Sequence, residues 1–121
     1  MADSIIHSYR DLIVWQKSMD LVVEVYKLTD KFPKSEIYGL AMQIRRAVVS
    51  IPSNISEGKN RGTRKDFRHF LLNAYGSGAE LETQIEIVQR LPFGKKFDFH
   101  KINSLLNEVM RMLNSIIIKL N

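Results

Sequence analysis

Apolar residues recur along the chain at alternating spacings of three and four, which is the pattern of helices with one buried face. Four stretches show this pattern, and turn-forming residues separate them. They predict helices over residues 11–31, 35–58, 63–90 and 98–120. Because the connections are short, consecutive helices should lie antiparallel. The pattern therefore predicts an all-α fold, an antiparallel up-down-up-down four-helix bundle.

The first stretch carries a wider apolar arc than one seam of a bundle uses. One stripe consists of Leu12, Trp15, Met19, Val22 and Tyr26, and a second consists of Val14, Leu21, Val25 and Leu28. An arc this wide indicates either deep burial within the monomer or contact with another subunit. The additional isoleucines of the last stretch, Ile117 and Ile118, favour the same kind of interface.

The second stretch keeps its helical phase straight through Pro52. We therefore expect one helix that is kinked at Pro52, not two short helices. Proline removes a backbone donor and costs about 3 kcal/mol inside a helix, so neighbouring groups should compensate. The hydroxyls of Ser50 and Ser53 and the amide of Asn54 are expected to bond the freed carbonyls of Val48 and Val49.

Glycines mark two further points of this arrangement. Gly58 is expected to end the second helix in the left-handed C-cap conformation. The centre of the third helix contains Gly76, Ser77 and Gly78, and each glycine there costs about 1 kcal/mol relative to alanine. Such a segment predicts the close approach of a neighbouring backbone, near Pro52.

Composition limits the range of functions. A chain of 121 residues predicts a single domain over 1–121, with residues 1–9 as a loose N-terminal lead-in. The absence of cysteine excludes disulfides, thiolate metal sites and cysteine nucleophiles, and it suits a cytoplasmic location. No signal peptide is visible, and no apolar run is long enough to span a membrane.

The net charge of +5 is a mild bias toward polyanionic partners. Lys59, Arg61, Arg64, Lys65 and Arg68 cluster around the second connection and the start of the third helix. Cations are unfavourable at a helix N-terminus, so local stability does not explain this cluster, and phosphate binding does. The alternative is a solvated rim that only keeps the protein soluble. No base-stacking motif accompanies the cluster, so binding would be directed to the backbone.

Two further arginines, Arg45 and Arg46, point to different sides of the second helix. We expect Arg45 to join the phosphate-binding set. Arg46 shares a polar stripe with Asn54 and Glu57, and this favours a structural ion pair with Glu57 or with an acidic residue of the third helix.

Enzymatic chemistry has little support in the sequence. The spacing of Arg64 and His69 resembles the motif of HEPN ribonucleases, which act without a metal. Five residues along a helix, however, turn these side chains by about 140° from each other. Asp66 and His69 alone cannot form the paired motifs of a di-metal centre in a bundle. We therefore predict no catalytic residue, no metal site and no cofactor.

Several segments resemble a known family, the small proteins encoded in intervening sequences of bacterial 23S ribosomal RNA genes. The clearest segments are Phe32–Leu40, Gln43–Ala47 and Ser50–Gly58, and Leu12–Gln16 and Gly76–Thr83 also fit. Ser56 stands where alanine is common in the family, and Gly78 is an additional glycine.

The resemblance implies an antiparallel four-helix bundle that assembles as a homopentamer. It also implies a partner class, because a distant relative, the accessory protein of diversity-generating retroelements, binds nucleic acid. It implies no reaction. The sequence thus favours a non-enzymatic, oligomeric module that binds RNA or DNA phosphates. The alternatives are a structural or protein-interaction ring without a nucleic-acid role and, third, a HEPN-like ribonuclease.

Overall fold

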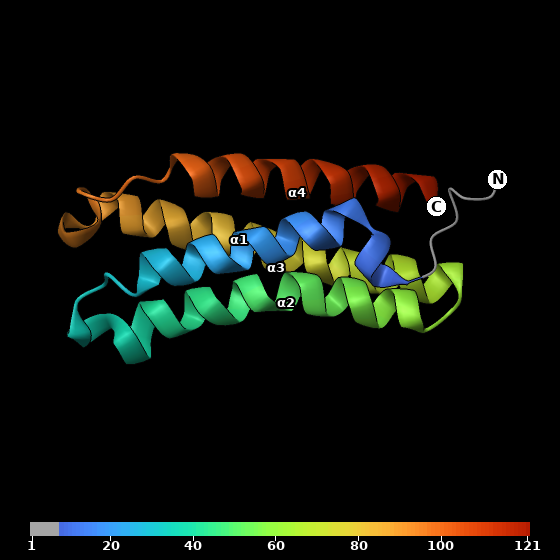
Figure 1. Cartoon of the computed structure of the whole chain (residues 1–121), viewed down its shortest axis with the longest axis horizontal. Coiled ribbons are helices and arrows are strands. Elements are labelled where there is room, and N and C mark those ends of the chain that lie inside the picture. The colour runs from blue at the N-terminus through green and yellow to red at the C-terminus, as the bar shows by residue number, and fades with distance from the viewer. Residues whose placement is uncertain (1–7) are drawn as a thin grey trace.

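The computed structural model describes residues 8–121 and confirms the all-α four-helix bundle. Its helices are α1 (Ile13–Thr29), α2 (Met42–Asn60), α3 (Arg64–Arg90) and α4 (His100–Lys119), and the described residues include no strand. Figure 1 shows each helix running back along the one before it. The first seven residues of the predicted lead-in lie outside the described part. The described chain opens with a short turn, η1 (Tyr9–Asp11), which the Ser8 hydroxyl caps.

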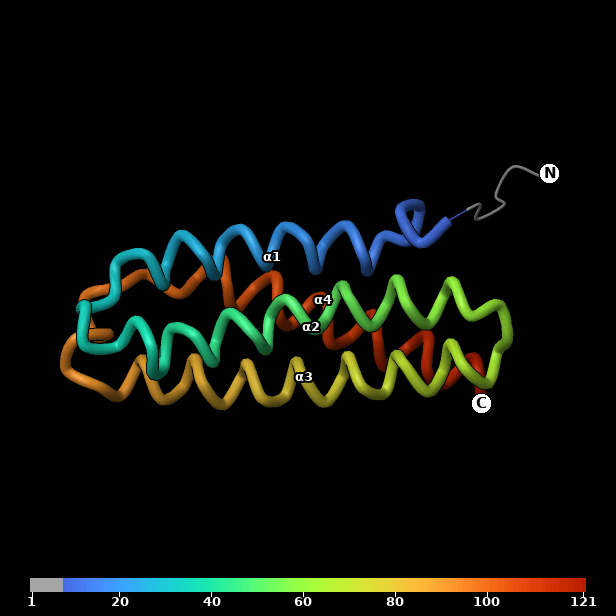
Figure 2. The backbone as a smooth tube through the Cα atoms, turned by 90° about the horizontal axis from the view of Figure 1, so that it is seen from below, coloured from blue at the N-terminus to red at the C-terminus, as the bar shows by residue number. Residues whose placement is uncertain are grey.

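The four helices surround one apolar core. Each of α1 and α3 contacts both α2 and α4, and the contact between α2 and α3 is the most extensive in the molecule. In Figure 2, α1 and α3 accordingly lie on opposite sides, with α2 and α4 between them. Leu21, Ile44, Ile51, Leu81 and Leu113 are fully buried at the centre. Every helix therefore contributes to the same core.

The two apolar stripes of α1 have different surroundings. The stripe that contains Leu21 and Val25 is buried in the core. In the other stripe, Met19 is 40% exposed and Tyr26 is 39% exposed. Deep burial within the monomer is thus wrong for the stripe that contains Met19 and Tyr26, and an apolar surface is left on α1.

The chain before α2 is less regular than its apolar period predicts. A 3₁₀ turn, η2 (Lys34–Glu36), is followed by a π-type turn, η3 (Ile37–Ala41), in which Gly39 has non-helical angles (φ −109°, ψ −108°). Regular helix begins only at Met42. The irregular turn leaves Ile37 exposed and Tyr38 85% exposed.

Pro52 lies inside one continuous α2, so the prediction of a single helix is confirmed. The kink itself stays a prediction. The side-chain amide of Asn54 donates to the carbonyl of Ser50 (2.8 Å), because Asn54 reaches back by one turn. The expected bonds to the carbonyls of Val48 and Val49 are therefore wrong for this amide. The Ser50 hydroxyl accepts from Asn54 (2.9 Å) and bonds Ser77.

Gly58 does not cap α2, so that prediction is wrong. The helix continues to Asn60, and the glycine with a positive φ is Gly62 (φ 86°). Gly58 is buried against α3, where an added Cβ would lie 2.6 Å from Cβ of Phe70. The glycine is required for close packing of α2 on α3 and not for a turn.

The glycines of α3 also differ from expectation. An added Cβ at Gly76 would meet no atom within 4 Å, and one at Gly78 would meet the Met110 side chain of α4. Pro52, in contrast, lines a hollow with Trp15 and other residues of α1. The predicted approach of Gly76 and Gly78 to Pro52 is therefore wrong. What joins the two helices in this region is the hydrogen bond between the Ser50 and Ser77 hydroxyls (2.8 Å).

Ion pairs connect α1 to α4 at the surface. Lys101 bonds Glu24 (3.2 Å), and Lys17 lies 3.6 Å from Glu108. The hydrogen bond from Lys101 holds the pKa of the Glu24 carboxyl below its ordinary value. Pairs as accessible to solvent as these contribute little to stability compared with the core.

The packing of Gly58 gives a stability prediction. Gly58→Ala should destabilise the protein by about 1–3 kcal/mol, because the new methyl group has no space beside Phe70. Gly76→Ala is the matched control, since it makes the same change in an open helical position and should stabilise by up to about 1 kcal/mol. Urea unfolding followed by circular dichroism measures both. Equal effects would contradict the close contact.

Candidate nucleic-acid interface

The predicted basic cluster lies at one end of the bundle. Lys59 is in the last turn of α2, Arg61 is in the connection, and Arg64, Lys65 and Arg68 are in the first turns of α3. In Figure 1 this end also contains the end of α4. We refer to these five side chains as the basic end.

Local sequence fixes the connection that carries the basic end. Gly62 adopts a positive φ, which allows the chain to turn directly after α2. The Thr63 hydroxyl then accepts a hydrogen bond from the backbone N–H of Asp66 (3.1 Å) and caps α3. The short turn therefore holds the cations of both helices close together.

Arg64 and Arg68 contact the last carbonyls of α4. The Arg64 guanidinium donates to the carbonyl of Lys119 (3.0 Å), and Nε of Arg68 donates to that of Ile117 (3.3 Å). The end of a helix has unpaired carbonyls and a partial negative charge, so both contacts are favourable. This corrects the expectation that local stability gives no reason for cations at the start of α3. The reason lies on the neighbouring helix.

The other cations of the basic end have different surroundings. Lys59 lies 5.5 Å from the ring of Phe67, and Arg61 lies 5.0 Å from the ring of Phe70. Arg61 also pairs with Glu57 (3.0 Å). Lys65 is exposed and has no hydrogen bond, ion pair or ring contact within residues 8–121. Its ammonium is the most available charge of the set.

A shallow pocket of about 540 Å³ lies on the basic end. Arg64, Lys65, Arg68 and His69 all contribute to its lining. The helical spacing suggested that Arg64 and His69 diverge, yet both reach this pocket, because it extends across the surface of the first turns of α3. Its lining can bind an anion through several charged donors at once.

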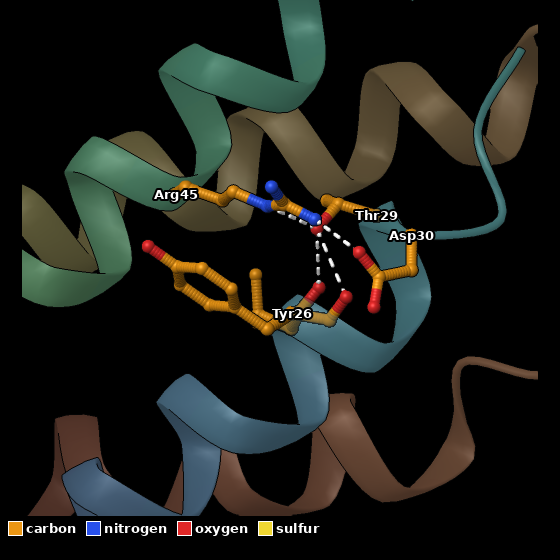
Figure 3. A network of polar contacts seen from close by, with 5 residues as sticks. Tyr26, Thr29, Asp30 and Arg45 are labelled. Atoms are coloured by element: carbon orange, nitrogen blue, oxygen red, sulfur yellow. Dashed lines mark hydrogen bonds and ion pairs between the residues drawn. The ribbon is translucent and has the colours of Figure 1, made fainter. Parts of the chain in front are cut away.

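Arg45 is not part of this interface. Its Nε donates to the hydroxyl of Thr29 (2.7 Å), and its Nη2 pairs with Asp30 (2.8 Å). Its guanidinium also lies 4.5 Å from the ring of Tyr26. Figure 3 shows these contacts between α2 and the end of α1. Two N–H donors of Arg45 and one face of its guanidinium are therefore used within the molecule, and the residue joins α1 to α2.

The ion pair predicted for Arg46 is absent from the described part of the chain. Glu57, its expected partner, pairs with Arg61. Among the described residues no carboxylate lies within 4.0 Å of the Arg46 guanidinium. Arg45, which was expected to remain free for phosphate, instead makes the interhelical contacts. Spacing along one helix could not distinguish the two, because the partner of Arg45 lies on α1.

The described residues contain no group of three or more histidine or acidic side chains placed to hold a metal ion. None of the helices within residues 8–121 has the length and apolar character needed to cross a membrane.

The chain is similar to a known protein family in sequence and to a solved crystal structure in fold. The sequence model of the 23S rRNA-intervening sequence protein family matches residues 10–115. The chain is also similar to the crystal structure of a protein with unknown function from the S23 ribosomal protein family of Bacteroides thetaiotaomicron. The TM-score is 0.79 at 27% sequence identity, and the match covers 87% of this chain and 98% of that one. A search of curated protein sequences gives no match.

Proposed function

The chain belongs to the 23S rRNA-intervening sequence protein family, and from this premise we propose that it is a non-enzymatic, self-associating module that binds RNA or DNA. The contact surface is the basic end. Lys59, Arg61, Arg64, Lys65 and Arg68 bind phosphates of the nucleic-acid backbone.

The observation that carries this proposal is the concentration of charge. Residues 59–69 contain five cationic side chains and a single carboxylate, so they account for most of the net charge of +5. A guanidinium has five N–H donors, and the contacts of Arg64 and Arg68 with α4 each use only one of them. The remaining donors are held in place by those contacts and stay available for phosphate oxygens.

The same surface supports recognition of the backbone and not of the bases. Phe67 and Phe70, the aromatic residues closest to the cations, are only partly exposed and lie against Lys59 and Arg61. They offer little surface on which a base could stack. Binding should therefore depend strongly on salt and weakly on nucleotide sequence.

Self-association is supported by the apolar surface of α1 and α2. Eight of the twelve exposed large apolar side chains in the described part lie on α1, η3 or α2. Two adjoining hollows of about 430 and 310 Å³ lie between these helices and share Val49. A surface of this kind is typical of an interface, and the resemblance to pentameric proteins names another copy as its occupant. A ring repeats the basic end and strengthens binding through avidity.

Nucleic-acid binding is tested by its salt dependence. In gel shifts with single-stranded RNA, log affinity should fall linearly with log salt concentration. Arg64→Ala with Lys65→Ala should reduce the magnitude of the slope by about 1–2 per copy. Lys34→Ala with Lys95→Ala removes the same charge from the opposite end and should leave the slope unchanged.

Absence of a shift at low salt would contradict this function and leave the protein-interaction ring. Cleavage of the RNA without metal, lost in His69→Ala, would instead make the protein a ribonuclease.

Self-association is tested by light scattering of the eluted protein. The particle mass should be five times the 14.0 kDa of one chain, as expected for a pentamer. Met42→Glu places a charge on the apolar surface and should yield monomers with unchanged helix content. Ile87→Glu, at a position on α3 with nearly the same exposure, is the control and should preserve the assembly. A monomeric wild-type protein would contradict self-association.

A further inference from the structure

A polar cleft of about 470 Å³ lies between α2 and α3, separate from the basic end. Its lining residues are Gln43, Arg46, Ala47, Ser50, Ser77 and Glu80. All of them belong to the segments that carry the family resemblance, and nucleic-acid binding uses none of them. The volume lies in the range of small-molecule sites.

Hydrogen bonds fix the hydroxyl wall of this cleft. Ser50 Oγ and Ser77 Oγ lie 2.8 Å apart, one on each helix. The Asn54 amide donates to Ser50 Oγ (2.9 Å) and so orients that hydroxyl. Because both hydroxyls are on regular helix and already positioned, a ligand would meet them with little loss of entropy.

The carboxylate that lines the cleft, that of Glu80, is held in place by a hydrogen bond from Gln84. The Gln84 side-chain amide donates to Oε2 of Glu80 (3.2 Å). Gln84 is only 6% exposed, and its Oε1 is buried without a hydrogen-bond partner in the described part of the chain. A buried amide with an unpaired oxygen is costly, so its presence here needs a reason. Its contact leaves Glu80 Oε1 for a group in the cleft.

Arg46 supplies the opposite charge. It lies on the ridge between this cleft and the apolar hollow beside Tyr26, and it lines both. No ion pair within residues 8–121 involves its guanidinium, Glu80 included. The cleft thus presents one unpaired cation and one oriented anion, which do not neutralise each other.

We propose that this cleft binds a small polar zwitterion of the class of free α-amino acids. The ligand carboxylate pairs with Arg46, and its ammonium group pairs with Glu80. Ser77 and Gln43 supply neutral hydrogen bonds to a polar ligand side chain.

Other ligand classes fit the lining less well. Ala47 is its only apolar residue and none is aromatic, so a nucleobase or a lipid chain would have no surface to pack against. One carboxylate is too few for a divalent cation, and the balanced charges do not favour a polyanion.

The test is isothermal titration of the full chain with the twenty proteinogenic amino acids at up to about 10 mM each. At least one polar amino acid should bind in a saturable manner. Its amide, which lacks the carboxylate, and its N-acetyl derivative, which lacks the ammonium, should each bind about tenfold or more weakly.

Two variants assign these contacts to residues. Arg46→Gln should weaken the parent amino acid about tenfold but leave the affinity of its amide nearly unchanged, because each change removes the same interaction. Glu80→Gln should likewise weaken the parent amino acid about tenfold but leave the affinity of its N-acetyl derivative nearly unchanged. Lys65→Ala changes the basic end only and should not affect amino-acid binding. Conversely, Arg46→Gln changes the cleft only and should leave the salt dependence of RNA binding as it is in the wild type.

Absence of binding for all twenty amino acids would overturn the proposal. Equal losses for the parent ligand and its amide in Arg46→Gln would overturn it as well. RNA binding is scored separately, so neither result bears on the function of the basic end.

Discussion

The hydrogen-bonded seam between α2 and α3 is the constraint on which the rest of the bundle depends. The helices are held in one register by the Ser50–Ser77 hydroxyl pair and approach closely where Gly58 lies against Phe70. Small residues and a shared polar pair are strong determinants of register, because a shift by one turn would leave the hydroxyls unpaired and place a side chain where only glycine fits. The other two helices pack onto this pair and complete the core.

The location of the functional surface follows from the seam. Because α2 and α3 are joined by a short turn in this register, the cations at the end of one helix and the start of the other are brought together. The end of α4 lies beside them and accepts hydrogen bonds from Arg64 and Arg68. The same arginines therefore stabilise the bundle and present charge to solvent. A structural role and a phosphate-binding role are compatible for arginine, because its five donors can serve both.

The sequence was sufficient for the helices and insufficient for their contacts. The spacing of apolar residues located all four helices. It also predicted correctly that α2 continues past Pro52, since burial of one helix face outweighs the loss of one backbone donor. It was wrong for residues 35–41, which were predicted to be regular helix and form irregular turns instead. Gly58 was mistaken for a cap because a glycine near a helix end has the same sequence signature whether it turns the chain or admits a neighbouring helix. The contacts of Arg45 with Thr29 and Asp30, and of Arg64 with α4, join residues far apart in sequence, and spacing cannot indicate them.

The register of the seam is tested most directly by a cross-link, for which the cysteine-free chain is well suited. Ser50→Cys with Ser77→Cys should form an intramolecular disulfide under mild oxidation and keep its helix content, because the two hydroxyl oxygens already lie 2.8 Å apart. Ser53→Cys with Ser77→Cys should remain reduced, since Ser53 lies on the side of α2 that faces α1. Mass spectrometry of the oxidised monomer distinguishes the outcomes. A reduced first pair together with a cross-linked second pair would contradict the register on which this account rests.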